Sequence, residues 1–214
     1  MLETSERHRV VRIVEILRAC YPDVKTQLDH ADAFQLLIAT ILSAQCTDRQ
    51  VNRVTPNLFR TFPDPRAFAQ ADPELLERLI RPTGYFRNKA KHIRECARAI
   101  IERHEGRVPD SLEALVALPG VGRKTANVVL GAAFGRPTIV VDTHVKRIAK
   151  RLGLTDSDNP TRIETDLMAV IPKPDWSDFS LQLIYLGREY CIARRPRCAV
   201  CPLRMLCPSS HRTG

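Results

Sequence analysis

The residues with the clearest chemical potential lie between Leu118 and Asp142, in the stretch LPGVGRKTANVVLGAAFGRPTIVVD. Lys124 follows two closely spaced glycines, and the carboxylate of Asp142 comes eighteen residues later. A lysine amine acts as a nucleophile when it is neutral, and a nearby carboxylate can take up a proton. The pair therefore predicts covalent catalysis by an amine, although either residue alone is more often a solvated lysine or a helix cap.

The glycines before Lys124 predict the turn that would position it. Pro119-Gly120 suits the centre of a type II turn, because proline fixes φ and glycine accepts a positive φ. Gly122 removes a side chain where the backbone would approach another surface. The first N–H groups of the next helix suit a phosphate. On that helix, Asn127 and Gly131 lie on the same face as Lys124, and we expect this face to be open. The face expected to pack inward comprises Thr125, Val128, Val129, Ala132 and Ala133.

Four cysteines near the C-terminus form a second candidate site, with the spacing C-x6-C-x2-C-x5-C. Four thiolates so close in sequence could hold zinc or an iron–sulfur cluster. Zinc sites usually pair two C-x2-C units across a longer gap, and this stretch has one such unit. The candidate ligands are Cys191, Cys198, Cys201 and Cys207. We expect Cys20, Cys46 and Cys96 to be small buried residues on helices.

The composition indicates a globular protein with polyanionic partners. The chain has 214 residues, 44% of them hydrophobic, and a net charge of +9. Six arginines stand against one acid, Glu189, between Tyr185 and Gly214. A solvated basic surface is the alternative explanation of this charge. No apolar run approaches the ~20 residues of a membrane span, and the N-terminus carries charges where a signal peptide would be apolar. We therefore expect a cytoplasmic protein with reduced thiols.

The elements that must position these residues are predicted to be helices, so the fold class is all-α. The helix over 87–104 should bury its aliphatic residues and turn its basic residues outward. Thr47, Ser111, Asp142 and Asn159 are placed to cap helices. A strand-like run covers only Thr138 to Val141, which is too short to found a sheet. The other predicted helices cover residues 5–21, 33–43, 48–59, 142–152, 159–170 and 179–190.

PGVGRKTA, followed by VDTHVKR and the cysteine pattern, closely resembles the helix-hairpin-helix DNA glycosylases of the endonuclease III family. The resemblance extends from about Val10 to Cys207. It implies a two-domain helical fold and a 4Fe–4S cluster held by the four C-terminal cysteines. A central helical-barrel domain would span 25–134, with the helix-hairpin-helix at 111–134. The second domain would combine 1–24 with 135–214 and carry the cluster loop, 191–207.

The resemblance also implies the reaction. Members of this branch remove oxidised or ring-damaged pyrimidines from DNA and then nick the strand as AP lyases. Lys124 would attack C1′ of the sugar and form a Schiff base, and Asp142 would take a proton and stabilise positive charge. Relatives that have no lysine at this position use water instead. The partner would be double-stranded DNA with damaged bases or abasic sites, bound by a monomer in a bacterial cytoplasm, at the nucleoid and away from membranes.

A damaged base must leave the duplex to react, so residues are needed to open the stack. By resemblance, Gln45 fills the gap and the turn at Gly84-Tyr85-Phe86 wedges the opposite strand. The expected DNA contacts are Gln45, Tyr85, Gly120, Gly122, Arg123, Arg194, Arg195 and Arg197. The residues expected to line the lesion pocket are Ser43, Asp48 and His144.

Three other functions remain open on the sequence. A monofunctional mismatch glycosylase would share the cluster, but Lys124 disfavours it, as does a chain that stops soon after Cys207. A non-catalytic helix-hairpin-helix protein would explain the charge and the hairpin, but it leaves the pairing of Lys124 with Asp142 a coincidence. An electron-transfer protein built on the cluster leaves the hairpin unexplained.

Overall fold

The computed structural model describes residues 4–210, and every regular element in this range is a helix. This confirms the all-α prediction. None of these helices combines the length and apolar character needed to cross a membrane. The α-helices are α1 (Thr4–Cys20), α2 (Ala33–Leu42), α3 (Asp48–Thr61), α4 (Pro65–Ala69), α5 (Pro73–Ile80), α6 (Phe86–His104), α7 (Leu112–Val116), α8 (Arg123–Phe134), α9 (Thr143–Arg151), α10 (Pro160–Val170) and α11 (Trp176–Glu189). Four short 3-10 helices are η1 (Arg81–Thr83), η2 (Lys173–Asp175), η3 (Cys198–Val200) and η4 (Arg204–Leu206).

The chain folds into two compact units, each with its own hydrophobic core. The central unit is continuous and spans Thr26–Arg136. The outer unit combines the residues up to Lys25 with those from Pro137 onward. The outer unit therefore depends on both ends of the chain, whereas the central unit is built from one uninterrupted segment.

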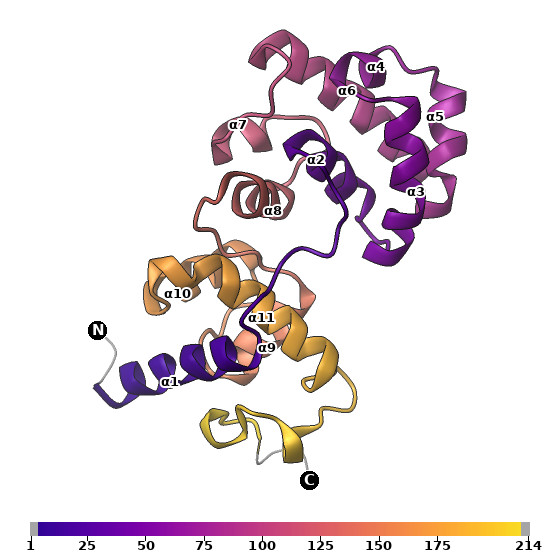
Figure 1. Cartoon of the computed structure of the whole chain (residues 1–214). Coiled ribbons are helices and arrows are strands. Elements are labelled where there is room, and N and C mark those ends of the chain that lie inside the picture. Colours follow the sequence, from indigo (N-terminus) through magenta and orange to yellow (C-terminus); the bar gives the residue numbers. More distant parts are fainter. Residues whose placement is uncertain (1–3, 211–214) are drawn as a thin grey trace. The chain divides into compact units, whose positions relative to one another are not determined.

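Helix α2 is the centre of the core of the central unit. All but two of its residues are buried, because its sequence FQLLIATIL is apolar on every side. It packs against α3, α6 and α8, and α4 and α5 also pack on α6 (Figure 1). Asp32 caps its start by accepting a hydrogen bond from the N–H of Gln35 at 2.8 Å. The predicted helix over 33–43 is confirmed, apart from its last residue.

In the outer unit, α1 packs on α11, although the two helices lie far apart in sequence (indigo and orange in Figure 1). The apolar stripe of α1 consists of residues at helical spacing, and all of them are buried. They are Val10, Ile13, Val14 and Leu17. Helix α9 packs between α10 and α11 with its own stripe, which comprises Val145, Ile148 and Ala149.

The predicted caps are confirmed. Thr47 Oγ accepts from the N–H of Gln50 at the start of α3, and Ser111 Oγ accepts from the N–H of Ala114 at the start of α7. Each side chain pairs one of the N–H groups that a helix start leaves without an intrahelical partner. Asn159 does the same for α10, and Asp142 for α9. These helix starts are therefore set by local sequence.

The strand-like run from Thr138 to Val141 is extended but pairs with no strand in the described chain. Its N–H groups turn to hydroxyls on α11: Thr138 donates to Ser177 Oγ at 3.2 Å, and Val140 donates to Ser180 Oγ at 3.0 Å. Side chains of a helix thus satisfy the donors that a neighbouring strand would otherwise accept.

Candidate active site

The glycine hairpin before α8 forms the predicted turn. The N–H of Val121 donates to the carbonyl of Leu118 at 3.1 Å, and Gly120 has a φ of +76°, as a type II turn requires. A Cβ on Gly120 would lie 2.6 Å from Cβ of His92 on α6. The turn therefore requires glycine at position 120 for two reasons: its positive φ and its close contact with α6.

Gly122 has a different role from Gly120. It is the N-cap residue of α8, with an ordinary φ of −86°, and no protein atom lies within 4 Å of where its Cβ would be. The close intramolecular approach is thus made by Gly120, and Gly122 faces open space. Arg123 and Lys124 follow in the first turn of α8, and both are exposed. This end of α8 carries the partial positive charge of a helix start, where the first N–H groups have no intrahelical acceptor.

The prediction for the inward face of α8 was partly wrong. The buried residues are Ala126, Asn127, Val129 and Leu130. Ala132 is exposed, and Thr125, Val128 and Ala133 are half-buried. The buried face of α8 is rotated relative to the predicted one, because α2 and α7 of the same unit pack on it. Asn127, which was expected beside Lys124 on the open side, is therefore buried, whereas Lys124 is exposed.

Asp142 begins α9 in the outer unit. Its Oδ1 accepts from the N–H of Val145 at 2.8 Å, and the residue is half-buried. The carboxylate therefore has a fixed position whether or not it also takes part in chemistry. Lys124 belongs to the central unit and Asp142 to the outer unit, and their joint action stays a prediction.

Gln45 and Tyr85, expected to enter the DNA stack, share an unusual backbone. Both have left-handed angles, with φ of 54° at Gln45 and 48° at Tyr85, and both side chains are exposed. Non-glycine residues adopt this region rarely and at some cost, and such residues gather at functional loops. Tyr85 is 65% exposed, which is unusual for an aromatic residue of a folded protein.

The three residues expected in the lesion pocket lie in two different units. Ser43 is the C-cap residue of α2, where its Oγ donates to the carbonyl of Thr40 at 2.8 Å, and Asp48 opens α3. His144 is on α9, where Arg147 lies 3.1 Å from its Nδ1 and a Cβ on Gly187 would lie 2.6 Å from that atom. Burial lowers the pKa of His144, with Asp142 acting in the opposite sense. Packing against α11 accounts for this histidine, and its contact with a lesion stays a prediction.

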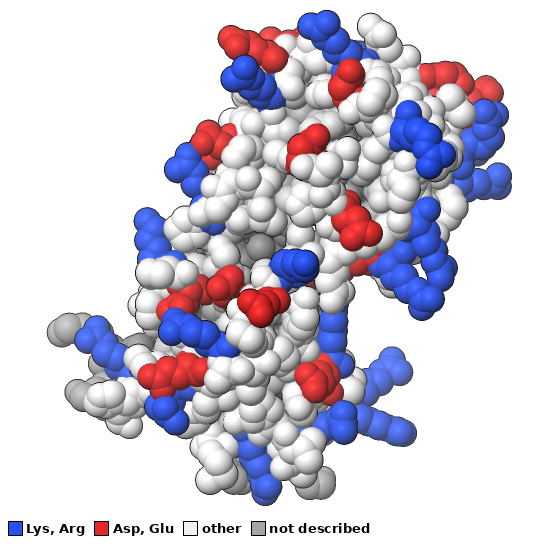
Figure 2. Space-filling model, in the orientation of Figure 1, with Lys and Arg blue, Asp and Glu red and all other residues white. Residues whose placement is uncertain are grey.

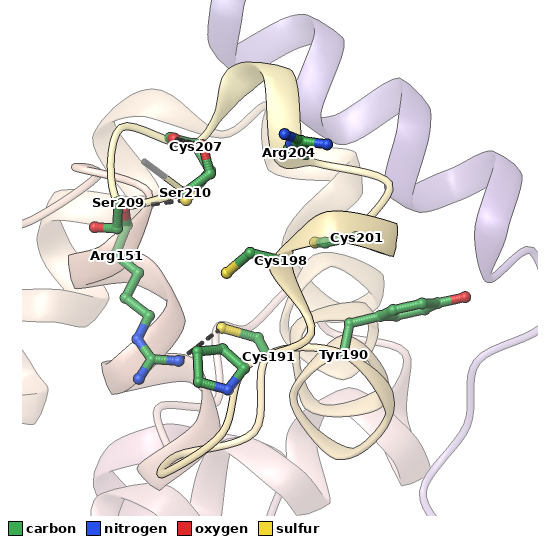
Figure 3. Close-up of a pocket in the computed structure, with 10 residues that line it drawn as sticks. Arg151, Tyr190, Cys191, Cys198, Cys201, Arg204, Cys207, Ser209 and Ser210 are labelled. Atoms are coloured by element: carbon green, nitrogen blue, oxygen red, sulfur yellow. Dashed lines mark hydrogen bonds between the residues drawn. The ribbon is translucent and has the colours of Figure 1, made fainter. Parts of the chain in front are cut away.

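The four C-terminal cysteines line one pocket of the outer unit (Figure 3). Cys191 follows α11, Cys198 opens η3, Cys201 directly follows η3, and Cys207 directly follows η4. The 3-10 turns bring the N–H of Cys201 to the carbonyl of Cys198 at 3.3 Å. In the described residues, no three His, Cys, Asp or Glu side chains are grouped so that they could hold a metal ion.

Burial and the neighbouring cysteines shape the chemistry of this pocket. Burial is the main cause that raises the pKa of Cys201 and of Cys207, and the other thiols of the set add to it. Such thiols lose their protons when a cation binds among them. Of the other cysteines, Cys96 is buried, which raises its pKa to about 12, as expected for a core residue. The same expectation was wrong for Cys20, which is exposed, and for Cys46, which is half-buried in the α2–α3 joint.

Two arginines of α9 hold the cysteine loop to the helix that Asp142 begins. Arg147 donates to the carbonyl of Cys191 from Nε at 3.1 Å and from Nη2 at 2.9 Å. Arg151 reaches Sγ of Cys191 at 3.2 Å and the carbonyls of Ile192 and Ala193 at 3.2 and 2.9 Å. Neither residue was predicted from the sequence. Their i, i+4 spacing on the polar face of α9 was the available signal.

Arg194, Arg195 and Arg197 lie on the loop between Cys191 and Cys198, and all three are exposed. The N–H of Arg197 donates to the carbonyl of Tyr190 at 2.8 Å and closes this loop at its base. On the face in view, Figure 2 shows basic and acidic side chains interspersed. The run of arginines is therefore a local feature of the cysteine loop.

One buried lysine contradicts the expectation that the basic residues of α6 point outward. Lys89 is only 4% exposed, and its Nζ donates to the carbonyl of Leu42 at 2.8 Å and of Thr83 at 2.7 Å. Burial lowers its pKa. Its position beside Ala90, which is also buried, was the only local hint, because both acceptors come from other elements.

Known proteins with the same architecture cover almost the whole chain. Endonuclease III from Synechocystis sp. is 53% identical over 97% of this chain and 95% of its own length. A solved non-covalent endonuclease III–DNA complex matches 99% of this chain and 98% of that protein, with a TM-score of 0.92 and 42% identity. A trapped covalent endonuclease III–DNA intermediate matches equally well, with a TM-score of 0.92, 42% identity and 99% coverage of both chains.

The family profile described as "HhH-GPD superfamily base excision DNA repair protein" matches residues 38–173. This range includes the glycine hairpin, Lys124 and Asp142, and it crosses from the central unit into the outer one. The chain therefore belongs to the HhH-GPD superfamily of base excision DNA repair proteins.

Proposed function

We propose that this protein is a DNA glycosylase with AP lyase activity that removes oxidised or ring-damaged pyrimidines. The observation that carries the proposal is Lys124, an exposed amine in the first turn of α8, directly after the type II hairpin. A covalent mechanism is supported by the solved structure of a similar endonuclease III as a trapped covalent intermediate with DNA. A protein that only binds DNA needs the hairpin but has no use for a nucleophile beside it.

Lys124 supplies the bond-forming atom. Its neutral amine attacks C1′, the bond from C1′ to the damaged base breaks, and the base leaves and takes up a proton. Opening of the sugar ring gives a Schiff base between Nζ and C1′. Loss of a proton from C2′ then breaks the C3′–O bond and expels the 3′ phosphate, which nicks the strand. Water releases the lysine for another cycle.

Asp142 acts on the proton and on charge. The helix cap holds Oδ1 in place, so the carboxylate needs little reorganisation when a proton leaves the amine. A fixed negative charge also stabilises the positive charge that develops on the sugar as the base departs. An asparagine would cap α9 as well but could do neither of these things.

DNA is held at separate places along the chain. The start of α8, with Gly120, Gly122 and Arg123, offers N–H groups and positive charge to a phosphate. Arg194, Arg195 and Arg197 offer three further cations on one short loop. Gln45 and Tyr85 enter the stack, and Ser43, Asp48 and His144 contact the extruded base. Phosphate contacts of this kind position a protein without reading sequence, which suits an enzyme that must find lesions anywhere.

The cofactor that we propose for the cysteine pocket is a 4Fe–4S cluster, which Cys191, Cys198, Cys201 and Cys207 would hold. Support comes from four thiols lining one pocket and from a hydrogen bond to one ligand sulfur, which is typical of such clusters. The cluster would cross-link a segment in which Leu203 is the single buried residue between 191 and 210. Iron and zinc analysis of the purified protein tests this assignment, and zinc without iron would contradict it.

Borohydride trapping on lesion-bearing DNA tests the reaction. Reduction of the Schiff base leaves the protein covalently attached to the strand, so the parent protein should form a stable adduct on a ring-saturated pyrimidine and on an abasic site. Lys124→Ala should form none. Lys91→Ala is the matched control, because Lys91 is an exposed lysine on α6 of the same unit. Trapping by Lys124→Ala at the parent level would refute Lys124 as the nucleophile.

A further inference from the structure

Two loops of the central unit carry strained, exposed residues, and one buried side chain joins them. Gln45 follows the end of α2 by three residues, and Tyr85 follows η1 by two. Both have left-handed backbones. Tyr85 also starts α6 without a side-chain cap. Neither side chain packs in the core. The local contact at Gln45 is a backbone turn, closed by a hydrogen bond from the N–H of Cys46 to the carbonyl of Ser43 at 3.0 Å.

The side chain that joins them is that of Lys89, the fourth residue of α6. Its Nζ donates to the carbonyl of Leu42 at 2.8 Å and to the carbonyl of Thr83 at 2.7 Å. Leu42 is the last residue of α2, and Thr83 is the last residue of η1. Carbonyls at helix ends have no intrahelical donor, and a cation at the negative end of a helix is favourable. The backbone N–H of Lys89 also donates to the carbonyl of Tyr85 at 3.1 Å.

Burying the ammonium group of Lys89 at this position costs free energy. Lys89 is 4% exposed, and both acceptors of its ammonium are uncharged carbonyls. Replacing a buried charge by an apolar side chain of similar volume is often neutral or stabilising. Stability alone therefore does not explain a lysine here. Only a long side chain with several donors can link the carbonyl of Leu42, 47 residues away, to that of Thr83, 6 residues away.

We propose that Lys89 is a positioning residue that holds the loops of Gln45 and Tyr85 in register so that both enter DNA together when a base is extruded. This rests on the proposed function. The chemistry at C1′ does not involve Lys89, since it is buried in the central core. Its contribution is to pre-organise two loop ends that would otherwise have to be ordered during extrusion, the step that a stacked duplex makes difficult.

The test uses two substrates that differ in how much stacking must be broken. One duplex carries 5,6-dihydrothymine, which must be extruded. The other carries an abasic site at the same place, which has no base to unstack. Lys89→Met keeps the length of the side chain but loses the donors. It should lower the rate of base release by about tenfold or more, since misplacement of about 1 Å can cost a hundredfold, and should leave nicking at the abasic site within about threefold.

The controls separate positioning from folding and from charge. Lys91→Met removes an exposed lysine from the same helix and should change neither rate. Lys89→Gln keeps one donor group and should fall between the parent and Lys89→Met, and it replaces Lys89→Met if that variant does not fold. 2-Aminopurine placed beside the lesion should report less unstacking with either Lys89 variant. The loss should not add to that of Gln45→Ala, because both act on the same loop.

An equal loss on both substrates would show that Lys89 is merely structural, and unchanged base release would show that it has no role; either result overturns the proposal. Failure of the parent protein to release dihydrothymine or to nick the abasic site would instead overturn the proposed function. Additive losses in the double variant Lys89→Met/Gln45→Ala would show that the lysine does not act through the Gln45 loop.

Discussion

The hairpin before α8 and the cysteine loop after α11 both lie beside exposed arginines, but they are built in opposite ways. The hairpin is defined by four consecutive residues, from Leu118 to Val121, and by one glycine pressed on His92. The cysteine loop has one buried residue, Leu203, and is held by Arg147 and Arg151 from α9. The conformation of the short turn is determined by its own residues. The polar loop depends on hydrogen bonds from α9 and, as we propose, on a bound cluster.

The sharpest way to test this contrast is to remove a cysteine. Cys198→Ser should lose nearly all bound iron, and protease should then cleave within 191–207 in an otherwise folded protein, because binding of a structural metal is also folding free energy. DNA affinity should fall by about tenfold or more as the arginines lose their fixed places. Cys20→Ser is the control, since Cys20 is exposed and outside the pocket. A Cys198→Ser protein with the parent's iron content and protease resistance would refute the assignment.

The hairpin should instead break through its backbone. Gly120→Ala combines a positive φ with a Cβ placed 2.6 Å from Cβ of His92, so unfolding free energy should fall by about 1–3 kcal/mol. Gly122→Ala has the same change in composition but meets nothing within 4 Å, and its stability should change by no more than about 0.5 kcal/mol. Denaturant unfolding measures both. Equal destabilisation by the two would mean that the His92 contact and the left-handed angle are unimportant.

The arginines that hold the cysteine loop should show an intermediate effect. Arg151→Met loses hydrogen bonds to Sγ of Cys191 and to two carbonyls, which should cost about 1–2 kcal/mol. The measurement is the rate at which an iron chelator bleaches the cluster, expected to rise several-fold. Lys150→Met, which removes only a surface ion pair with Asp158, should leave that rate unchanged. Identical bleaching of the two variants would remove Arg151 from the account of the loop.

The smallest structural effect is expected at Asp142, where cap and proposed catalysis coincide. Asp142→Asn should change stability by less than about 0.5 kcal/mol because asparagine caps equally well, yet base release should fall by about a hundredfold or more. Asp142→Ala should show the same loss of activity and should also lower the free energy of unfolding by about 1 kcal/mol. Thermal unfolding and a base-release assay separate the two roles. Full activity in the asparagine variant would leave Asp142 only a cap.

Predictability from sequence follows the same division. The caps at Thr47, Ser111 and Asp142 and the turn at Pro119-Gly120 depend on residues within four positions, and the structure confirms them. The inward face of α8 was predicted with error, because which face is buried depends on how α2 and α7 pack.

The role of Lys89 could not be predicted, because its acceptor on Leu42 lies 47 positions away. Arg151 is a similar case, at 40 positions from Cys191. The sequence does not distinguish a long polar side chain that is solvated from one that donates to a distant carbonyl. The extended run after Thr138 was expected to lack a sheet, but the use of Ser177 and Ser180 as acceptors needed the tertiary structure.

The split of the outer unit has a consequence for synthesis of the protein. Helix α1 leaves the ribosome first, but its partner α11 ends only at Glu189, so at about 5–20 residues per second the stripe of α1 waits roughly 10–30 s for its partner. The continuous central unit can fold during that time. We therefore expect the nascent chain to expose Val10, Ile13, Val14 and Leu17 after its middle is already native, which makes the first helix the natural target for a chaperone.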